Sequence, residues 1–543
     1  MTNGWSRTHG VQHAIGACGS VQPPKICEGA RRTPTSTSCA RPTHNKYGLL
    51  RHLLDTVVRH TGNTTAMCTW LFAIALVAPN TFAHPLEQQS RLHLPYQPLI
   101  SMEGKPKGVG YQYANGQLPL QARPSYLNVT NPTQRAALAL DALQSWYNPN
   151  TGLWETTGWW NGANIMTVVG DFANADPENN TLQTLARNVF ATTLVKAPGK
   201  NPNPGVEDRR AQGKPGVASW GRWGQGRWRA WGGEYKKYLD PNTGEPHTSY
   251  PTNWYTISMA PAAAIDSSAP NASDWLDGYY DDDLWWALAW INAYDVTFNT
   301  PYLKLAEDIF LAVARTWGTY CFGGGIYWSH EKNYVNAIAN ELFFSTAAHL
   351  ATRVEFQKQV VYREWAEKSL KWFLQTGMLN QKGTINDGLT KDCKNNGQTT
   401  WSYNQGVILG GLVELQKASP SPKNQFIALA SHIANAALIE LSDRKGVIHD
   451  ECEPNCGADG TQFKGIFMRN LVKLQGAGKE DFRKAINANA NSIWENDRSA
   501  LDNGLNVFSV DWAGPFIQPA NASTQSSAME ALIGAVVVPC RDC

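Results

Sequence analysis

The chain has 543 residues, of which 42% are hydrophobic, so it is long enough to bury a large core. Its 47 Lys and Arg against 45 Asp and Glu leave a net charge of +2, split as +6 on residues 1–66 and −4 on the rest. The charge balance excludes a broad basic surface, and we expect no nucleic-acid partner.

The first 83 residues have the composition of processing segments rather than of a folded domain. Residues 67–83, MCTWLFAIALVAPNTFA, join an uncharged apolar core to Thr81-Phe82-Ala83, with small residues at the −3 and −1 positions of a signal-peptide cleavage site. The apolar core of about ten residues is too short to cross a bilayer. A signal so far from Met1 indicates that Met67 is the true start. We therefore interpret residues 1–66 as a mis-annotated upstream extension, with a disordered leader as the alternative.

Six cysteines lie beyond His84, and an even number in a secreted chain favours disulfides. Cys452 can close a small loop with Cys456, as can Cys540 with Cys543, but six cysteines leave fifteen pairings open. A zinc site is the alternative, although no histidine pair accompanies the cysteines at ligand spacing, and we expect no metal.

Four N-glycosylation sequons predict modified surface loops, at Asn128, Asn179, Asn271 and Asn521. The C-terminus, ALIGAVVVPCRDC, is too short and too polar for a GPI signal. We expect a secreted, extracellular and soluble monomer, without stable membrane association, that can associate with a cell wall.

After a Pro-, Gln- and Gly-rich stretch over residues 84–130, apolar residues recur at helical spacing. The pattern predicts about twelve helices, near 133–147, 161–172, 182–196, 283–297, 302–317, 335–352, 359–376, 404–417, 423–441, 463–475, 480–497 and 523–536. Strand-like alternation is scarce, so residues 84–543 are predicted to form one all-α domain. Twelve helices in hairpin pairs suit a double ring of inner and outer helices.

Residues 199–278 interrupt this series of helices. They contain SWGRWGQGRWRAWGGEYKKY, in which Trp, Gly and Arg alternate. The segment is either a loop that grips a ligand or an insertion that packs on the mouth of the barrel.

Three consecutive acids, Asp281, Asp282 and Asp283, open the most aromatic helix, YYDDDLWWALAWINAYD. One acid can cap the helix and a second can favour its macrodipole. A third, beside two tyrosines and two tryptophans, exceeds what capping requires. Two carboxyl groups under aromatic walls are what glycoside hydrolysis needs, because one attacks and the other donates a proton.

Five other segments combine polar and aromatic residues where a predicted helix begins, and a helical barrel would gather them at one end. They are GWWNGAN (158–164), GGGIYWS (323–329) leading to NAIANEL (336–342), INDGL (385–389), TWSYNQG (400–406) and DGTQFKGIF (459–467). Each alone can be a cap or a turn. As a series they favour a binding surface.

In order and spacing, YYDDDLWWALAWINAYD, GGGIYWSHEKNYVNAIANELFF, INDGL, WSYNQGVILGGLVEL and DGTQFKGIFMRNL resemble the signature blocks of glycoside hydrolase family 76. These are the α-1,6-mannanases of fungi and bacteria, and the resemblance covers roughly residues 133–500. It implies an (α/α)6 barrel, cleavage of α-1,6-mannan with retention of configuration, and no cofactor.

The resemblance also implies roles for single residues. Asp281 corresponds to the nucleophile and Asp282 to the general acid/base, which leaves Asp283 as the expected helix cap. Polar sugar contacts are expected from Asn161 or Asn164, Asn336 or Asn340, Asp387, Tyr403, Gln405 and Lys464. Stacking partners are expected among Trp159, Trp160, Trp285, Trp286, Tyr327 and Trp328, about half of which belong to the core.

Two other functions stay open at this point. A mannan transglycosylase acting in wall assembly would pass the sugar to an acceptor instead of water. A non-catalytic mannan-binding protein would keep the cleft, although the intact Asp281 and Asp282 argue against it. The sequence does not separate endo from exo action.

Overall fold

The computed structural model describes residues 129–203, 236–249, 270–419, 424–500 and 504–540, all within one compact unit, residues 94–543. The predictions for the leader (1–66) and the signal peptide (67–83) lie outside the described residues, as does most of the insertion at 199–278.

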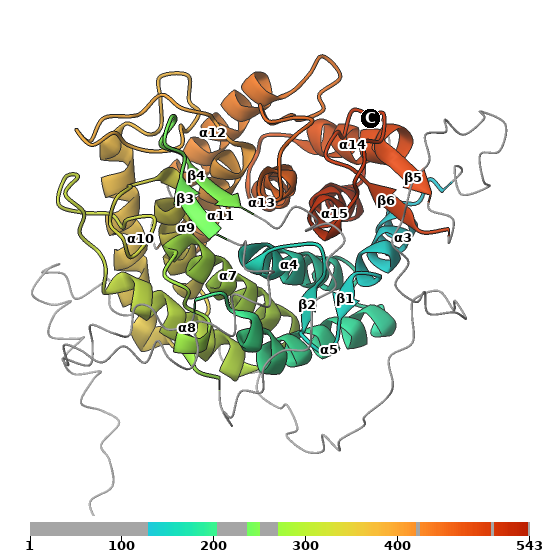
Figure 1. Cartoon of the computed structure of the whole chain (residues 1–543), viewed down its shortest axis with the longest axis horizontal. Helices are drawn as coiled ribbons and strands as arrows, with labels where there is room; N and C mark the ends of the chain where they lie inside the picture. Colours follow the sequence, from blue (N-terminus) through green and yellow to red (C-terminus); the bar gives the residue numbers. More distant parts are fainter. Residues whose placement is uncertain (1–128, 204–235, 250–269, 420–423, 501–503, 541–543) are drawn as a thin grey trace, which may run out of the picture. The chain divides into compact units, whose positions relative to one another are not determined.

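Six helices form an inner ring, and each packs against the next until the last meets the first (Figure 1). In chain order they are α4 (Trp159–Ala175), α7 (Tyr280–Thr297), α9 (Ala337–Leu350), α11 (Ser402–Ala418), α13 (Phe463–Ala477) and α15 (Ala522–Val537). Six more form the outer ring: α3 (Pro132–Gln144), α5 (Asn180–Lys196), α8 (Thr300–Ala314), α10 (Phe356–Thr376), α12 (Gln425–Leu441) and α14 (Arg483–Ser492). The predicted twelve-helix (α/α)6 barrel is confirmed.

The two rings differ in burial because of where they stand. Inner helices such as α9 and α15 are buried on nearly all sides, whereas outer helices such as α10 bury one face and expose the other. Glycines let inner helices approach closely. A Cβ on Gly406 of α11 would lie 2.5 Å from the Phe467 Cα atom of α13, so a larger residue would push the two helices apart.

Helix boundaries shift by a few residues from those predicted. The predicted helix 480–497 is divided into α14 and a π-helical turn at Ile493–Asp497. Among the described residues, strands occur as three antiparallel two-stranded hairpins. They are β1 with β2 (Tyr147–Asn148, Leu153–Trp154), β3 with β4 (Lys236–Leu239, Pro246–Ser249) and β5 with β6 (Arg498–Ala500, Asn506–Phe508).

Two disulfides join loops next to the N-terminal ends of inner helices. The predicted Cys452–Cys456 bond is present, and Cys321 pairs with Cys393, 72 residues away. Cys540 is also disulfide-bonded.

The sequon asparagines differ in their exposure to solvent. Asn271 is exposed and Asn179 is half-buried, but Asn521 is 1% exposed and its side chain caps α15. The prediction of a surface sequon at Asn521 is therefore wrong, because its amide oxygen is needed at the buried helix start. Within the described residues, every helix is too short or too polar to span a membrane.

Candidate active site

The three acids lie in the first turn of α7, where the sequence placed them. Their carboxyl groups are buried, and the helix N-terminus favours negative charge there. The residue at the N-cap is Tyr279, so the prediction that Asp283 caps the helix is wrong. Asp283 accepts a hydrogen bond from the backbone N–H of Asp277 at 2.9 Å, which fixes the loop that enters α7.

Asp281 is held by groups from two other segments. One of its oxygens, Oδ2, accepts the indole N–H of Trp328 at 3.2 Å and lies 3.8 Å from the Lys237 ammonium. The other, Oδ1, is buried and has no hydrogen-bond partner among the described residues. An unsatisfied buried carboxylate oxygen is costly, which points to a group that the site binds.

Asp282 is enclosed more completely. Its side chain is 0% exposed, against 13% for Asp281, and it forms an ion pair with Lys237. Lys237 comes from β3 of the hairpin in the insertion, and its ammonium lies 4.9 Å from the centre of the Tyr279 ring. The predicted aromatic cleft above the acids is therefore closed at this point, because the hairpin places a lysine directly on them.

The surroundings push the pKa values of the two acids apart. Burial raises the pKa of both, and Lys237 acts against that rise in both. The Trp328 N–H further lowers the pKa of Asp281. For Asp282 the charges of Asp277 and Asp281 add to the larger effect of burial, and its pKa is raised well above its usual range. Such a pair suits one ionised and one protonated carboxyl group.

Asp277 is a third carboxyl group at this point. Burial raises its pKa to about 6, against the lowering effects of Lys237, the Tyr279 backbone N–H and a hydrogen bond with Asp282. Lys237 itself is buried, which would lower its pKa, but the surrounding carboxylates raise it instead. The Lys237 ammonium thus interacts electrostatically with at least three carboxyl groups.

A second acidic group lies near the first. Asp387 accepts the phenol O–H of Tyr334 at 2.5 Å, and burial raises its pKa to about 7. Tyr403 stacks on Phe463, with ring centres 3.8 Å apart, and its pKa is raised by burial and then by Asp387 and Asp281. The motifs INDGL and WSYNQG therefore meet the acids, as a ring of motifs at one end of the barrel requires.

Several predicted sugar contacts hold this ring together instead. The amide of Asn161 bonds the Gly158 N–H and Gln462, that of Asn340 bonds both backbone groups of Ile326, and that of Gln405 bonds both of Ile385. Asn164 bonds the Trp160 carbonyl and Arg469. These amides already join neighbouring segments, so their hydrogen-bonding groups are engaged within the protein and not by a sugar.

Lys464, also a predicted sugar contact, is likewise engaged within the protein. Its side chain is 1% exposed, ion-pairs with Glu453 and donates to the Val510 carbonyl at 2.6 Å. Asn336 differs from the other amides: it is 0% exposed, and both side-chain polar atoms lack a partner within the described ranges. It stays a candidate for binding a hydroxyl group.

The aromatic candidates separate into core and site. Trp159 and Trp286 are 0% exposed and pack on each other and on Trp275, so they belong to the core. Trp160 stacks on Trp285 and donates its indole N–H to Asp459 at 2.7 Å, at the mouth end.

The other two predicted stacking partners, Tyr327 and Trp328, are adjacent in the loop before α9. Trp328 contacts Asp281, as described above, and is 3% exposed. Tyr327 is 8% exposed, and its hydroxyl accepts the backbone N–H of Tyr320 at 3.2 Å. Trp328 is thus the one placed against the acids.

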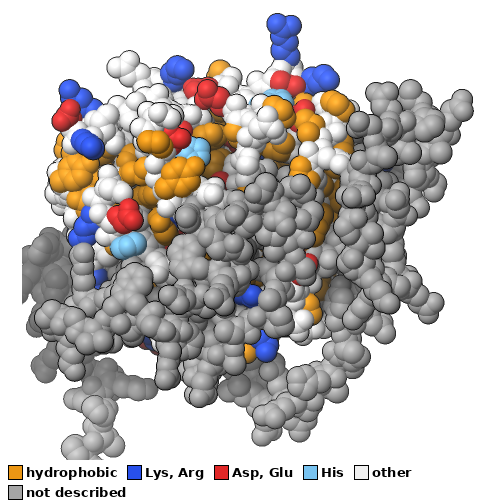
Figure 2. Space-filling model, in the orientation of Figure 1, with side chains coloured by type: hydrophobic (Ala, Val, Ile, Leu, Met, Phe, Trp, Pro, Cys, Tyr) orange, Lys and Arg blue, Asp and Glu red, His pale blue; other side chains and the backbone are white. Residues whose placement is uncertain are grey.

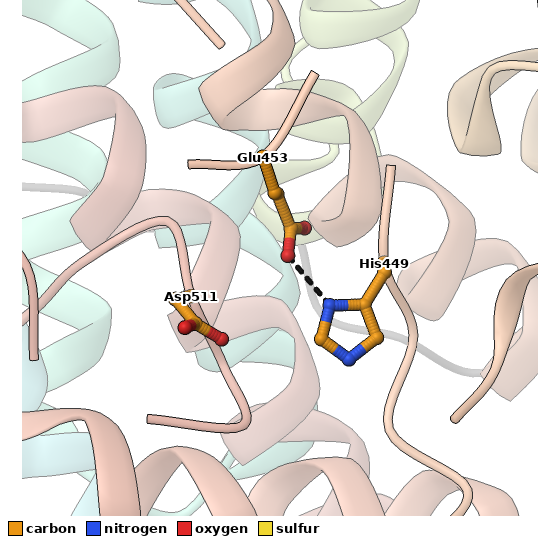
Figure 3. Close-up of side chains that lie close together, drawn as sticks. All are labelled: His449, Glu453 and Asp511. Carbon is orange, nitrogen blue, oxygen red and sulfur yellow. Dashed lines mark hydrogen bonds and ion pairs between the residues drawn. The ribbon is translucent and has the colours of Figure 1, made fainter. Parts of the chain in front are cut away.

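Among the described residues, one group has metal-ligand composition: His449, Glu453 and Asp511 (Figure 3). Figure 3 shows the His449 ring turned toward Glu453, with Asp511 on a separate loop. The two Glu453 oxygens are already engaged, one by His449 at 2.6 Å and one by Lys464. We interpret the group as an ion-pair network.

The charged side chains on the described surface show how the small net charge is distributed. On the described part of the face in Figure 2, acidic and basic side chains are interspersed, without separating by sign. This distribution agrees with the small net charge.

Sequence reasoning missed Lys237, Asp277 and Asp459. Lys237 follows no periodic pattern, and only its 45-residue separation from Asp282, closed by the fold, gives it meaning. Asp277 in Trp275-Leu276-Asp277-Gly278 has the signature of a turn. Asp459 opens the motif DGTQFKGIF, but the sequence predicts no contact for its side chain.

The fold and the site define a helical-barrel protein with a buried acid pair at its mouth. Its sequence also matches a known protein family. Residues 252–539, more than half of the chain, match the model of Glycosyl hydrolase family 76. The chain belongs to this family.

Two relatives are both described as "Mannan endo-1,6-alpha-mannosidase DCW1". The Saccharomyces cerevisiae protein is 27% identical over 278 residues, 47% of this chain and 59% of that protein. The Candida albicans protein is 27% identical over 331 residues, 56% of this chain and 69% of that protein. The chain thus spans about three fifths of the length of these curated relatives.

A solved structure shares the fold. It is an inactive variant of the alpha-1,6-mannanase GH76A of Salegentibacter sp. HEL1_6 in complex with alpha-1,6-mannotetrose. The TM-score is 0.54 at 16% identity, over 75% of this chain and 100% of that one. This similarity confirms the barrel.

Proposed function

We propose that this protein is a secreted glycoside hydrolase that cleaves α-1,6-mannosidic bonds in mannan through Asp281 and Asp282. The observation that carries the proposal is the buried acid pair in the first turn of α7, with pKa values pushed apart by different neighbours. Family membership and the names of the curated relatives support the substrate class.

The contacts favour a division of labour between the acids. Asp281 is the nucleophile, because the indole N–H of Trp328 stabilises its ionised form. Asp282 is the acid/base, because burial and then the charges of Asp277 and Asp281 favour its protonated form. Attack by Asp281 gives a covalent mannosyl-enzyme, which water then hydrolyses with retention of configuration.

Sugar contacts are proposed for the candidates that the fold leaves near the acids. Asp387, Tyr403 and Asn336 offer polar groups, and Trp160, Trp285 and Trp328 offer aromatic faces. Secretion is supported by the disulfides, and N-terminal sequencing of the secreted product tests the proposed start at Met67.

The test is incubation of the purified protein with unbranched α-1,6-mannan, followed by sizing of the products. Short oligomers are expected, which indicate endo cleavage, whereas mannose alone would indicate an exo enzyme. Products longer than the substrate, increasing with added acceptor sugar, would favour the transglycosylase. Binding without any product would favour the non-catalytic mannan-binding protein and contradict the proposal.

A further inference from the structure

The hairpin β3–β4 (Lys236–Leu239 and Pro246–Ser249) lies over the mouth end of the inner ring (Figure 1). It precedes residues 252–539, so the match to the family does not include it. The contacts of the hairpin with the barrel bear directly on the acid pair.

Lys237 is the innermost part of the hairpin. Its side chain is 3% exposed and its ammonium contacts Asp282 and lies 3.8 Å from Asp281. The Tyr279 and Trp328 rings lie 4.9 and 6.0 Å from the same ammonium. The proposed function assigns the two acids to the reaction and Trp328 to sugar stacking, so Lys237 occupies space that the substrate needs.

The consequence is greatest for Asp282. A general acid must reach the glycosidic oxygen, within about 3 Å. The Asp282 side chain is 0% exposed, with Lys237 against it, so in this arrangement it cannot reach a polysaccharide. Either Asp282 has no role in catalysis or the lysine moves away when substrate binds.

The rest of the hairpin is attached lightly enough to move. Among the described residues, the hairpin contacts the barrel through few groups besides the Lys237 side chain. The Tyr279 hydroxyl donates to the Lys237 carbonyl at 3.1 Å, Gln398 donates to the Thr243 carbonyl, and the Thr399 N–H donates to Glu245 at 3.3 Å. A two-stranded hairpin is at best marginally stable by itself. Tyr238 on β3 is 46% exposed, which shows that one face of the strand is not packed.

We propose that the β3–β4 hairpin is an autoinhibitory strap, and that the ion pair of Lys237 with Asp281 and Asp282 holds it closed until mannan displaces it. The inference rests on the proposed function for what the strap controls. A ligand that binds only the open form has its affinity reduced by the fraction of open molecules. Removing the ion pair therefore increases the open fraction and lowers KM, whereas kcat, measured after opening, changes little.

The test compares wild type with Lys237→Ala and with a matched control, Lys304→Ala, whose lysine is 62% exposed on the outer helix α8. Steady-state kinetics on α-1,6-mannotetraose are measured for each protein at its own optimal pH, because loss of Lys237 also alters the ionisation of the acids. We expect KM to fall about fivefold or more in Lys237→Ala, with kcat within about twofold. The control should match wild type.

A second measurement needs no mannan. A water-soluble carbodiimide with a glycine ester labels accessible carboxyl groups, and peptide mass spectrometry follows the peptide that contains Asp281 and Asp282. We expect faster labelling of this peptide in Lys237→Ala than in wild type or the control. Circular dichroism and the melting temperature confirm that each variant is folded, and Lys237→Met replaces Lys237→Ala if the latter is not.

The outcomes separate the two proposals. Unchanged KM with unchanged labelling overturns the strap, as does a fall in kcat at constant KM, which would make Lys237 a positioning residue. Faster labelling together with an inactive wild type supports the strap and contradicts the proposed mannanase activity.

Discussion

The two ends of the inner ring differ in how their acidic and basic side chains are paired. At the mouth, Asp277, Asp281 and Asp282 share one lysine from the hairpin, and burial raises the pKa of each acid. At the other end, toward the C-termini of the inner helices, a cavity of about 120 Å³ is lined by both signs of charge.

At that second end two arginines, Arg353 and Arg469, have carboxylate partners. Arg353 donates to Asp295 at 2.7 and 2.8 Å and to Glu414 at 2.8 Å, and Arg469 pairs with Glu530 at 3.3 Å. Although burial acts to raise the pKa of Glu414, His349, Arg353 and Lys417 together lower it. Losing one partner of a buried pair leaves an uncompensated charge, which is strongly destabilising. Burial raises the pKa of Glu530 to about 8 even beside Arg469, so a raised pKa alone does not separate the two ends. The mouth differs because at least three carboxyl groups share one lysine there, and such a cluster is typical of a functional site.

The largest effect on stability is expected from the bond that ties the mouth loops together. The Cys321–Cys393 disulfide closes a loop of 72 residues, so replacing both cysteines by alanine should lower the free energy of unfolding by about 4 kcal/mol. Urea unfolding measures the loss. Cys452→Ala with Cys456→Ala, which opens a five-residue loop, should cost only about 2 kcal/mol. Equal losses would contradict this view of how the mouth is held.

A smaller loss is expected at the opposite end. Arg353→Met leaves Asp295 without its cation and Glu414 paired with Lys417 alone, and we expect the free energy of unfolding to fall by about 3 kcal/mol. The rate per folded molecule on α-1,6-mannan should not change, because the acid pair lies at the other end. Arg483→Met, an exposed arginine paired with Asp481, is the control and should leave stability unaltered. A loss of activity at full stability would show that the ends are coupled.

The smallest effect is a pH dependence at the mouth. Asp387 has a pKa of about 7 in the fold, above its ordinary value of about 4, so the native state holds a proton that the unfolded chain releases. Stability from this group is present below about pH 4 and is lost as pH rises toward 7. Asp387→Asn removes that loss.

The stability of Asp387→Asn relative to wild type should therefore increase by about 1 kcal/mol or more between pH 4.5 and 7.5. Urea unfolding at the two pH values measures the increase. Asp392→Asn, exposed on the same loop, is the matched control. A difference that stays constant with pH would refute the raised pKa.

Much of the fold could be predicted because its signal is local. The twelve helices follow from apolar residues at helical spacing, and the acids of α7 from their position before that pattern begins. The same locality limits the site. Asn161, Asn336, Asn340 and Gln405 all belong to the polar-aromatic motifs. The amides of Asn161, Asn340 and Gln405 bond backbone or side-chain groups, whereas the Asn336 amide has no partner among the described residues. Nothing in the chain order distinguishes them.

The other errors come from contacts between distant segments. Trp286 and Trp285 are adjacent in sequence, but the helix turns one into the core and the other toward Trp160. Lys237 lies in a segment without periodicity, and only the hairpin register and the closing of the ring bring it to Asp282. Such contacts depend on the packing of the whole barrel, which no local pattern reports.

The most direct measurement is the rate at which reducing ends appear from α-1,6-mannan with wild type, Asp281→Asn, Asp282→Asn and Asp283→Asn at equal concentrations of folded protein. The account predicts that the first two substitutions each slow the reaction at least about a thousandfold, while Asp283→Asn stays within about tenfold of wild type. Wild-type rates in both Asp281→Asn and Asp282→Asn would contradict it.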